Sequence, residues 1–309
     1  NKSVGTIVAI SSYASYFWQP IMNLGNIFNN FINNIAYLER IFETMDEPVT
    51  VKDAKDAVEM PKIRGEVTFD HVNFSYDASK QILNDVSFTV KPGESVALVG
   101  PTGAGKSTIV NLISRFYNVN GGRVLIDGQD ISQVTIHSLR EQMGIMMQDS
   151  FIFSGDIEDN IRYGKLDATH EEIVKASRTV CADEFISKMP DRYQTEVRER
   201  GSMLSQGQKQ LISFARTLLS DPAILILDEA TSSIDVQTEK ALQTGLNAML
   251  KGRTSFIIAH RLSTIRNCDK IMYIDNGGIM ESGTHDELMA KDGYYKELYM
   301  SQYAFLEKM

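Results

Sequence analysis

A glycine-rich octapeptide between a strand-like run and a helix-like run is the feature that most restricts the fold of this chain. Gly100-Pro-Thr-Gly-Ala-Gly-Lys-Ser107 fits the spacing G-x-x-x-x-G-K-[S/T]. The apolar run Ser95–Val99 precedes it, and residues 105–116 have helical patterning. Glycines let successive backbone N–H groups curl around an anion, and the start of the helix adds partial positive charge. The sequence therefore predicts a phosphate loop at residues 100–108.

Two side chains of the phosphate loop are expected to act on a bound nucleotide. The Lys106 ammonium can neutralise β- and γ-phosphate oxygens, and the Ser107 hydroxyl can ligate Mg²⁺. A nucleoside triphosphate with Mg²⁺ is therefore the predicted ligand. The residues predicted to contact it are Gly100, Pro101, Thr102, Gly103, Ala104, Gly105, Lys106, Ser107 and Thr108.

An acid pair follows a second apolar run. Residues 223–227 are continuously apolar, as in a strand buried on both faces, and Asp228 and Glu229 come directly after them. Ligands of open parallel sheets bind at the carboxyl ends of the strands. Asp228 is therefore expected to hold a water of the Mg²⁺ shell, and Glu229 to orient and deprotonate an attacking water. Such a pair alone can also be the acidic start of a helix, but the phosphate loop favours the catalytic interpretation.

Strand-like and helix-like runs alternate from Gly65 onward, which favours an α/β domain with a largely parallel sheet. The helical stretch from about 139 to 219 is predicted as an inserted subdomain. With 31 basic against 40 acidic residues, the chain lacks the basic surface of a nucleic-acid-coating protein. Its two cysteines, Cys181 and Cys268, lack metal-ligand spacing and are expected to be reduced thiols.

The N-terminal part differs in composition. No charged residue occurs from Ser3 to Leu38, which exceeds the ~20 predominantly apolar residues of a membrane span. Six asparagines after Pro20 interleave with an apolar stripe at helical spacing. This stretch is either an amphipathic helix packed on a soluble core or the end of a membrane-spanning helix whose companions precede it. We favour the membrane for residues 1–38 and expect a charged, proline-containing linker at residues 48–64.

Leu204-Ser-Gln-Gly-Gln208 resembles the signature of ATP-binding-cassette (ABC) ATPases, whose usual form is L-S-G-G-Q. The phosphate loop, Gln148, this signature, the acid pair, Asp235 and His260 follow one another in the order of the family's motifs. The resemblance covers about residues 65–285.

For the fold, the resemblance implies an α/β P-loop NTPase: a RecA-like core with a mixed sheet flanked by helices, an inserted α-helical subdomain and an antiparallel β edge. It also implies an N-terminal transmembrane helix, so that residues 1–47 would be the end of an exporter's last membrane helix with a cytosolic extension. Residues 65–309 would be the nucleotide-binding domain.

The resemblance further implies roles for single residues. Tyr76 would stack on the adenine of ATP, Gln148 would contact Mg²⁺ and the attacking water, and His260 would lie near the γ-phosphate. Two cassettes would face each other with ATP between them. The catalytic residues that the resemblance implies are Lys106, Gln148, Glu229 and His260. The implied Mg²⁺ ligands are Ser107, Gln148 and, through water, Asp228. The residues implied to contact the ATP of the opposing cassette are Ser205, Gln206, Gly207, Gln208 and Asp235.

Two positions depart from the family pattern. Gln206 and Arg198 both stand where the family usually has glycine, Arg198 in a segment that senses the membrane domain. Because glycine permits close approach of the backbone to a phosphate, Gln206 is expected to loosen the site that this chain offers its partner. This resembles heterodimeric bacterial exporters, in which one half keeps the catalytic glutamate but has an altered signature. We therefore expect a second half-transporter as partner, and favour a heterodimer over a homodimer.

The implied function is that of an ATP hydrolase in the cell membrane, with its nucleotide-binding domain in the cytoplasm, that exports a substrate such as a drug or a lipid. The sequence disfavours three alternative functions. The uncharged N-terminal stretch disfavours a soluble importer ATPase, and the acidic charge disfavours a cassette that acts on ribosomes or DNA. Glu229 disfavours a nucleotide-binding module without turnover.

Overall fold

The structure is a computed structural model that describes residues 2–77, 80–146, 151–228, 236–258 and 262–302 of the 309-residue chain. The chain divides into two compact units, Asn1–Thr50 and Val51–Met309. Four residues predicted to take part in catalysis or in the partner's site, Gln148, Glu229, Asp235 and His260, lie outside the described residues.

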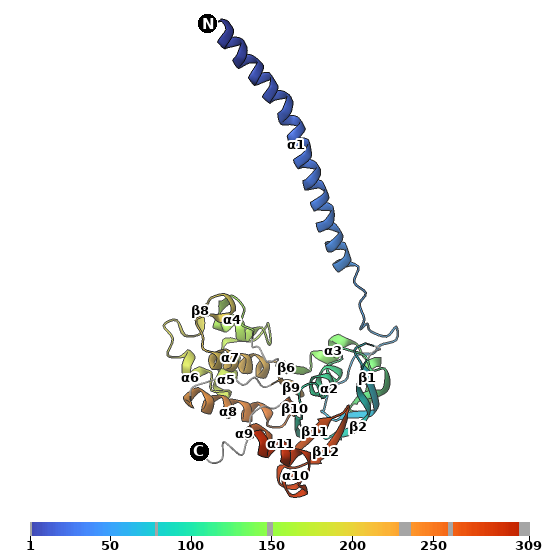
Figure 1. Cartoon of the computed structure of the whole chain (residues 1–309). Coiled ribbons are helices and arrows are strands. Elements are labelled where there is room, and N and C mark those ends of the chain that lie inside the picture. Colours follow the sequence, from blue (N-terminus) through green and yellow to red (C-terminus); the bar gives the residue numbers. More distant parts are fainter. Residues whose placement is uncertain (1, 78–79, 147–150, 229–235, 259–261, 303–309) are drawn as a thin grey trace. The chain divides into compact units, whose positions relative to one another are not determined.

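The first unit is a single helix, α1 (Lys2–Met45), with Pro20 inside it (Figure 1). Its large apolar side chains are 46–74% exposed. No helix in the described ranges, α1 included, contains a stretch that is both long and apolar enough to span a membrane. The six asparagines from Asn23 to Asn34 lower the hydropathy of this uncharged stretch.

A six-stranded sheet is the centre of the second unit, with strand order β12-β11-β3-β10-β9-β6. Its strands are β3 (Ser95–Val99), β6 (Met143–Met146), β9 (Ile224–Asp228), β10 (Thr254–Ile258), β11 (Lys270–Asp275) and β12 (Gly278–Gly283). Five of them run parallel, and β12 pairs antiparallel with β11 at one edge. Every residue of β3 and β10 is buried, which agrees with their mostly apolar sequences. The predicted mixed, largely parallel sheet is confirmed.

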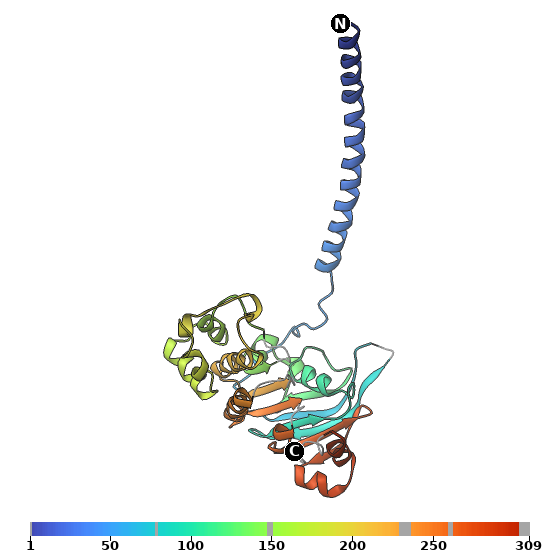
Figure 2. The ribbon, with the colours of Figure 1, turned by 60° about the vertical axis from the view of Figure 1, so that its left-hand side comes forward.

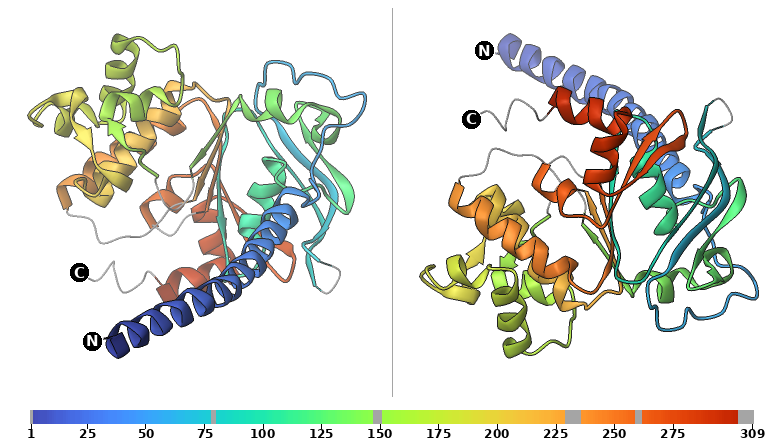
Figure 3. Two further views of the ribbon diagram at one scale, coloured as in Figure 1. Left: turned by 90° about the horizontal axis from the view of Figure 1, so that it is seen from above. Right: turned by 90° about the horizontal axis from the view of Figure 1, so that it is seen from below.

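A second, antiparallel sheet has the order β2-β1-β4-β5. Its strands are β1 (Val67–Ser75), β2 (Gln81–Val90), β4 (Gly121–Ile126) and β5 (Gln129–Asp130). Helix α2 (Lys106–Ile113) lies between this sheet and the six-stranded one (Figure 3). Phe69, Leu83, Ile109 and Phe256 belong to one buried cluster that joins both sheets to α2. This sheet is the antiparallel β edge that the family resemblance implied.

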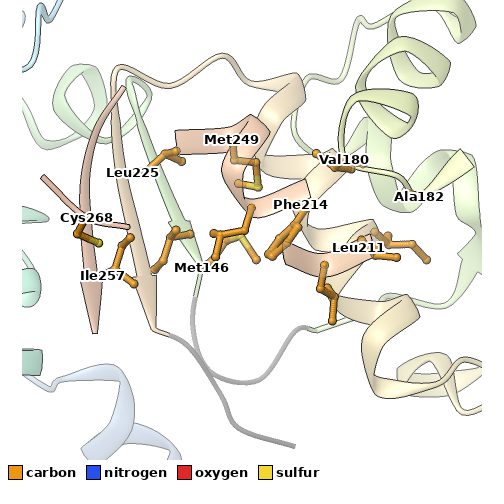
Figure 4. Close-up of a cluster of buried hydrophobic side chains, with 14 of the residues drawn as sticks. Met146, Val180, Ala182, Leu211, Phe214, Leu225, Met249, Ile257 and Cys268 are labelled. Carbon is orange, nitrogen blue, oxygen red and sulfur yellow. The ribbon is translucent and has the colours of Figure 1, made fainter. Parts of the chain in front are cut away.

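The helical part gathers beside the β6 edge of the six-stranded sheet (Figure 2). Its elements are α4 (Ile157–Arg162), α5 (His170–Thr179), α6 (Asp183–Ile186), η2 (Arg192–Gln194), η3 (Glu199–Gly201), α7 (Gln206–Leu219) and the small β7–β8 pair (Gly155–Asp156 and Glu196–Val197). Phe214 of α7 packs in one cluster with Met146, Leu225 and Met249, which attaches these helices to the sheet (Figure 4). Because β6 belongs to the six-stranded sheet, the helices of the predicted insertion begin only after it, at α4.

The other helices described in the second unit lie outside this helical part. They are η1 (Ile131–Gln133), α3 (Ile136–Arg140), α8 (Val236–Leu250), α9 (Leu262–Arg266), α10 (His285–Lys291) and α11 (Tyr294–Gln302).

Residues 51–64, called the connecting segment below, lie in the region predicted as a linker but pack on the second unit. Met60 and Ile63 are buried, and the Met60 N–H donates to Ser138 Oγ at 2.8 Å. Val58 forms a β-bridge with Val134. The segment is therefore fixed to the unit at several points, although its composition is typical of a solvated loop.

Candidate functional site

The phosphate loop and Asp228 leave the same edge of the six-stranded sheet. Leu98 of β3 and Asp228 of β9 both pair with Ile258 of the strand between them, β10, and all three strands are parallel. The loop starts at Gly100, two residues after Leu98, and ends where α2 begins at Lys106. The structure thus places the glycine-rich loop beside the first acid of the pair, as the sequence predicted.

The loop backbone requires its glycines. Gly100, Gly103 and Gly105 have φ angles of 138°, 81° and 106°. A Cβ atom on Gly100 would lie 2.1 Å from the Ile274 carbonyl oxygen, whereas one on Gly103 would meet nothing within 4 Å. Gly100 therefore permits a close approach of two backbones, and Gly103 supplies only the backbone conformation.

This difference predicts unequal effects of two alanine substitutions. Gly100→Ala should lower the free energy of unfolding by more than about 2 kcal/mol and abolish nucleotide binding, because the methyl group must displace β11 backbone. Gly103→Ala should cost only about 1–2 kcal/mol of backbone strain. Urea unfolding of both variants checks this, and equal losses would contradict the assigned role of Gly100.

The start of α2 is suited to an anion. Its N-cap, Gly105, offers no side-chain hydrogen bond, so the first N–H groups of the helix have no partner from within it. Lys106 Nζ donates to the carbonyl oxygens of Gly100 and Pro101, both at 2.8 Å. Burial lowers the pKa of Lys106, and the nearby charge of Asp228 opposes this. Unpaired N–H groups and a partly desolvated cation fit a polyphosphate.

The donor set also fits Mg²⁺ bound mainly through nucleotide phosphates. Among the described residues, no group of three or more His, Cys, Asp and Glu side chains gathers as metal ligands. Mg²⁺ in such sites takes one or two protein oxygens together with phosphate oxygens and water. Ser107, exposed at the start of α2, and Asp228, partly exposed at the end of β9, are the described residues predicted for this task.

Tyr76 lies beside the first turn of α2. Its hydroxyl is 3.1 Å from Thr108 Oγ1, and the side chain is 48% exposed. Its ring makes edge-on contacts, with centroids 4.9 Å apart, to Phe74 and to Tyr117. An exposed aromatic surface next to the phosphate loop is what the predicted contact with adenine needs. Sequence reasoning missed Tyr117, although an aromatic residue soon after the phosphate-loop helix was a usable signal.

The signature residues form the start of α7, a different element from the phosphate loop. Ser205 is the N-cap, and its hydroxyl accepts from the Gln208 N–H at 3.3 Å. In return, the Gln208 side chain accepts from the Ser205 N–H at 2.9 Å. This capping box uses both side chains within the chain itself. Gln206 is exposed in the first helical turn, where a side chain is compatible with the backbone.

A glycine-rich loop between a parallel strand and a helix, beside an acid at the end of a neighbouring strand, defines a P-loop NTPase. Residues 83–232 match the family model described as ABC transporter. The chain belongs to the ABC transporter family and carries its ATP-hydrolysing domain.

Relatives match nearly the whole chain. An uncharacterized ABC transporter ATP-binding protein of Bacillus subtilis is 52% identical over 98% of this chain and 50% of its own length. A fatty acid ABC transporter ATP-binding/permease protein of Mycobacterium bovis is 44% identical over 96% of this chain and 47% of its own. A solved bacterial Atm1-family ABC exporter with ATP bound has a TM-score of 0.80 and 41% identity, covering 97% of this chain and 52% of that chain. The chain therefore spans about half the length of the curated relatives that it matches.

Proposed function

We propose that this chain is the ATP-binding and ATP-hydrolysing part of an ABC exporter, in which a pair of cassettes couples ATP hydrolysis to export of a substrate. The observation that carries the proposal is the phosphate loop: an uncapped helix start with Lys106 held between two loop carbonyls, on the sheet edge where Asp228 ends β9. The exporter part is supported by the relatives, one of which is named a fatty acid transporter ATP-binding/permease protein.

The residues of the loop bind and orient ATP. The unpaired backbone N–H groups at the start of α2 and the Lys106 ammonium would face the phosphates, and the exposed Tyr76 ring beside Thr108 would contact the adenine. Ser107, Gln148 and, through water, Asp228 would hold Mg²⁺, which would supply positive charge opposite the phosphates. Glu229 accepts a proton from the attacking water, and His260 donates a hydrogen bond toward the γ-phosphate.

The signature residues would contact ATP that is bound at the phosphate loop of a second cassette. In the capping box, Ser205 Oγ already accepts from Gln208, so the Gln206 and Gly207 N–H groups are the unpaired donors of this helix start. These donors would meet the partner's phosphates together with Asp235. Because the Gln206 side chain occupies the first turn, we propose that a different half-transporter supplies the better signature, and that a homodimer is less active. Restoring glycine at this position (Gln206→Gly) in a homodimer should then raise its ATPase rate.

For the longer protein, we propose a multi-pass location in the cell membrane with the ATPase domain in the cytoplasm. Support comes from the relatives, which match α1 as well as the domain and include an ATP-binding/permease protein. In this arrangement residues 1–47 belong to the permease part and residues 65–309 to the ATPase domain.

The proposal is tested by ATP binding and hydrolysis in the full-length protein, produced with and without its partner half. We expect ATP hydrolysis that needs Mg²⁺ and rises when both halves are present. If the full-length protein binds ATP but does not hydrolyse it with any partner, the proposed hydrolysis is contradicted. The alternative of a nucleotide-binding module without turnover would then hold. Full activity without a second gene product would contradict the heterodimer.

The adenine contact predicts a graded response at Tyr76. Tyr76→Ala should weaken ATP binding by about 1–3 kcal/mol, which is the range for an aromatic stack on a base. Tyr76→Phe keeps the ring and loses only the hydroxyl contacts to Thr108 and Asn111, so its affinity should stay near that of the parent. Titration with a fluorescent ATP analogue measures the affinity of both variants. Equal losses of affinity in the two variants would show that the hydroxyl, and not the ring, contributes to ATP binding.

A further inference from the structure

An arginine occupies the residue just beyond the phosphate-loop helix, where glycine is usual. Ser114 is the C-cap of α2, and Arg115 follows it with φ 52°. The Arg115 N–H donates to Leu112 O at 3.0 Å and the Phe116 N–H to Asn111 O at 2.9 Å, which is the Schellman pattern. A left-handed residue with a long side chain is unfavourable here. We therefore expect contacts of the Arg115 side chain to offset this backbone cost.

The Arg115 guanidinium joins three segments of the chain. One terminal nitrogen donates to Lys52 O at 3.0 Å and to Ser132 O at 3.2 Å. The other donates to Val134 O at 2.5 Å and lies 3.8 Å from Asp53 Oδ1. Lys52 and Asp53 belong to the connecting segment, so the end of α2 is bound directly to it.

Two neighbours hold this junction. Asp53 Oδ1 also accepts from the Ile136 N–H at 2.8 Å, which attaches it to the start of α3. Arg140, at the end of α3, donates to the carbonyl oxygens of Ser114 at 3.0 Å and Arg115 at 2.8 Å. Asp53, Arg115 and Arg140 are called the arginine clamp below. These contacts connect both the residues that follow α2 and the connecting segment to α3.

The clamp is not arranged for stability alone. Arg115 is 2% exposed, and its Nε has no hydrogen-bond partner in the structure. It lines a cavity of about 40 Å³ together with Asp130 and Ser132. Burial and the neighbouring Arg140 lower the pKa of Arg115, while Asp53 opposes them. Well-packed apolar side chains often replace a buried ion cluster without loss of stability. This guanidinium instead connects elements that apolar contacts would hold less specifically.

We propose that Arg115 is a positioning residue that couples ATP binding at the phosphate loop to the connecting segment. Helix α2 has eight residues, about 12 Å of stiff structure, with the phosphate loop at one end and the clamp at the other. A shift of α2 on nucleotide binding reaches Lys52 and Asp53 through the guanidinium. The chain then runs from these residues to α1. This inference rests on the proposed binding of ATP at the loop.

Hydrogen exchange of the intact chain tests the clamp, with and without a non-hydrolysable ATP analogue and Mg²⁺. In the parent, the analogue should slow exchange in peptides covering residues 51–61. In Asp53→Asn, which keeps an oxygen for the Ile136 N–H but removes the charge beside Arg115, this slowing should shrink about fivefold or more. The affinity of the phosphate loop for the analogue should stay within about twofold.

Asp56→Asn is the matched control, since it removes the same charge from an exposed position three residues along. It should behave like the parent. Arg115→Lys keeps the charge but loses the forked donors, and should reproduce the Asp53→Asn result. The clamp is overturned if the parent binds the analogue without slower exchange at 51–61, or if Asp53→Asn keeps the full effect. Failure of the parent to bind the analogue would instead overturn the proposed function.

Discussion

Replacing Lys106 by methionine should weaken ATP binding by about 100-fold, equivalent to about 2.7 kcal/mol. The ammonium is the charge at the start of α2 that the structure holds between the carbonyl oxygens of Gly100 and Pro101. Hydrogen bonds from a charged donor contribute about 1.5–3 kcal/mol each, and a triphosphate takes more than one. Methionine fills a similar volume without supplying a donor. Calorimetric titration with MgATP measures the loss.

The same substitution should not destabilise the domain. Burial lowers the folded-state pKa of Lys106, so the charged form is less favoured in the folded chain than in the unfolded chain. This cost of folding is fully present below the folded-state pKa and fades as the pH rises above it toward the unfolded-state pKa. Thermal unfolding at neutral pH should therefore show an unchanged or raised midpoint for Lys106→Met.

A matched control separates charge in general from charge at this site. Lys91→Met removes an exposed lysine from the turn before β3 and should leave both ATP affinity and midpoint unchanged. Loss of affinity in Lys106→Met together with a lower midpoint would indicate that the lysine supports the loop and not the nucleotide.

The core of the fold could be predicted because its signals are local. The strands β3, β9 and β10 are rich in apolar residues, and the phosphate-loop glycines mark the turn between β3 and α2. Parallel strands of this kind leave few alternatives other than an α/β sheet. Their order in the sheet, with β10 between β3 and β9, came only from the structure.

The connecting segment shows where local signals fail. Its charges and prolines are typical of a linker, yet Met60 and Ile63 are buried and Gln142 Oε1 accepts from the Ile63 N–H at 2.8 Å. The contacts that fix it come from residues about 80 positions away in the chain, such as Ser138 and Gln142. The composition of a segment indicates whether its side chains favour water, but it does not reveal contacts with residues so distant in the chain.

The candidate site divides in the same way. Gly100 and Lys106 are readable because the chemistry of phosphate binding demands a fixed spacing, and the structure brings them beside Asp228. The capping box between Ser205 and Gln208 has a spacing signal of its own, S-x-x-Q. This signal lies within the signature motif, so the same residues were interpreted as the signature alone. Arg115 has no such signal, because its partners are backbone carbonyls from two distant segments, Lys52 in one and Ser132 and Val134 in the other.

Changing Glu229 to glutamine should separate binding from turnover. If Glu229 is the base for the attacking water, Glu229→Gln in the full-length protein with its partner should lower kcat by roughly 10²- to 10⁴-fold. Its ATP affinity should stay within about threefold of the parent, because the amide keeps the size of the side chain and the phosphate loop is untouched. Phosphate release under saturating MgATP gives the rate, and equilibrium binding gives the affinity.

Glu184→Gln, the same change at an exposed position of α6, is the matched control and should turn over normally. The pattern across variants carries the assignment: Lys106→Met loses binding, and Glu229→Gln keeps binding and loses chemistry. A trapped ATP-bound pair of cassettes should accumulate only in the second variant, because closure needs nucleotide and reopening needs hydrolysis. Near-normal turnover in Glu229→Gln would remove this residue from the role of base and move the proton transfer to another group at the same sheet edge.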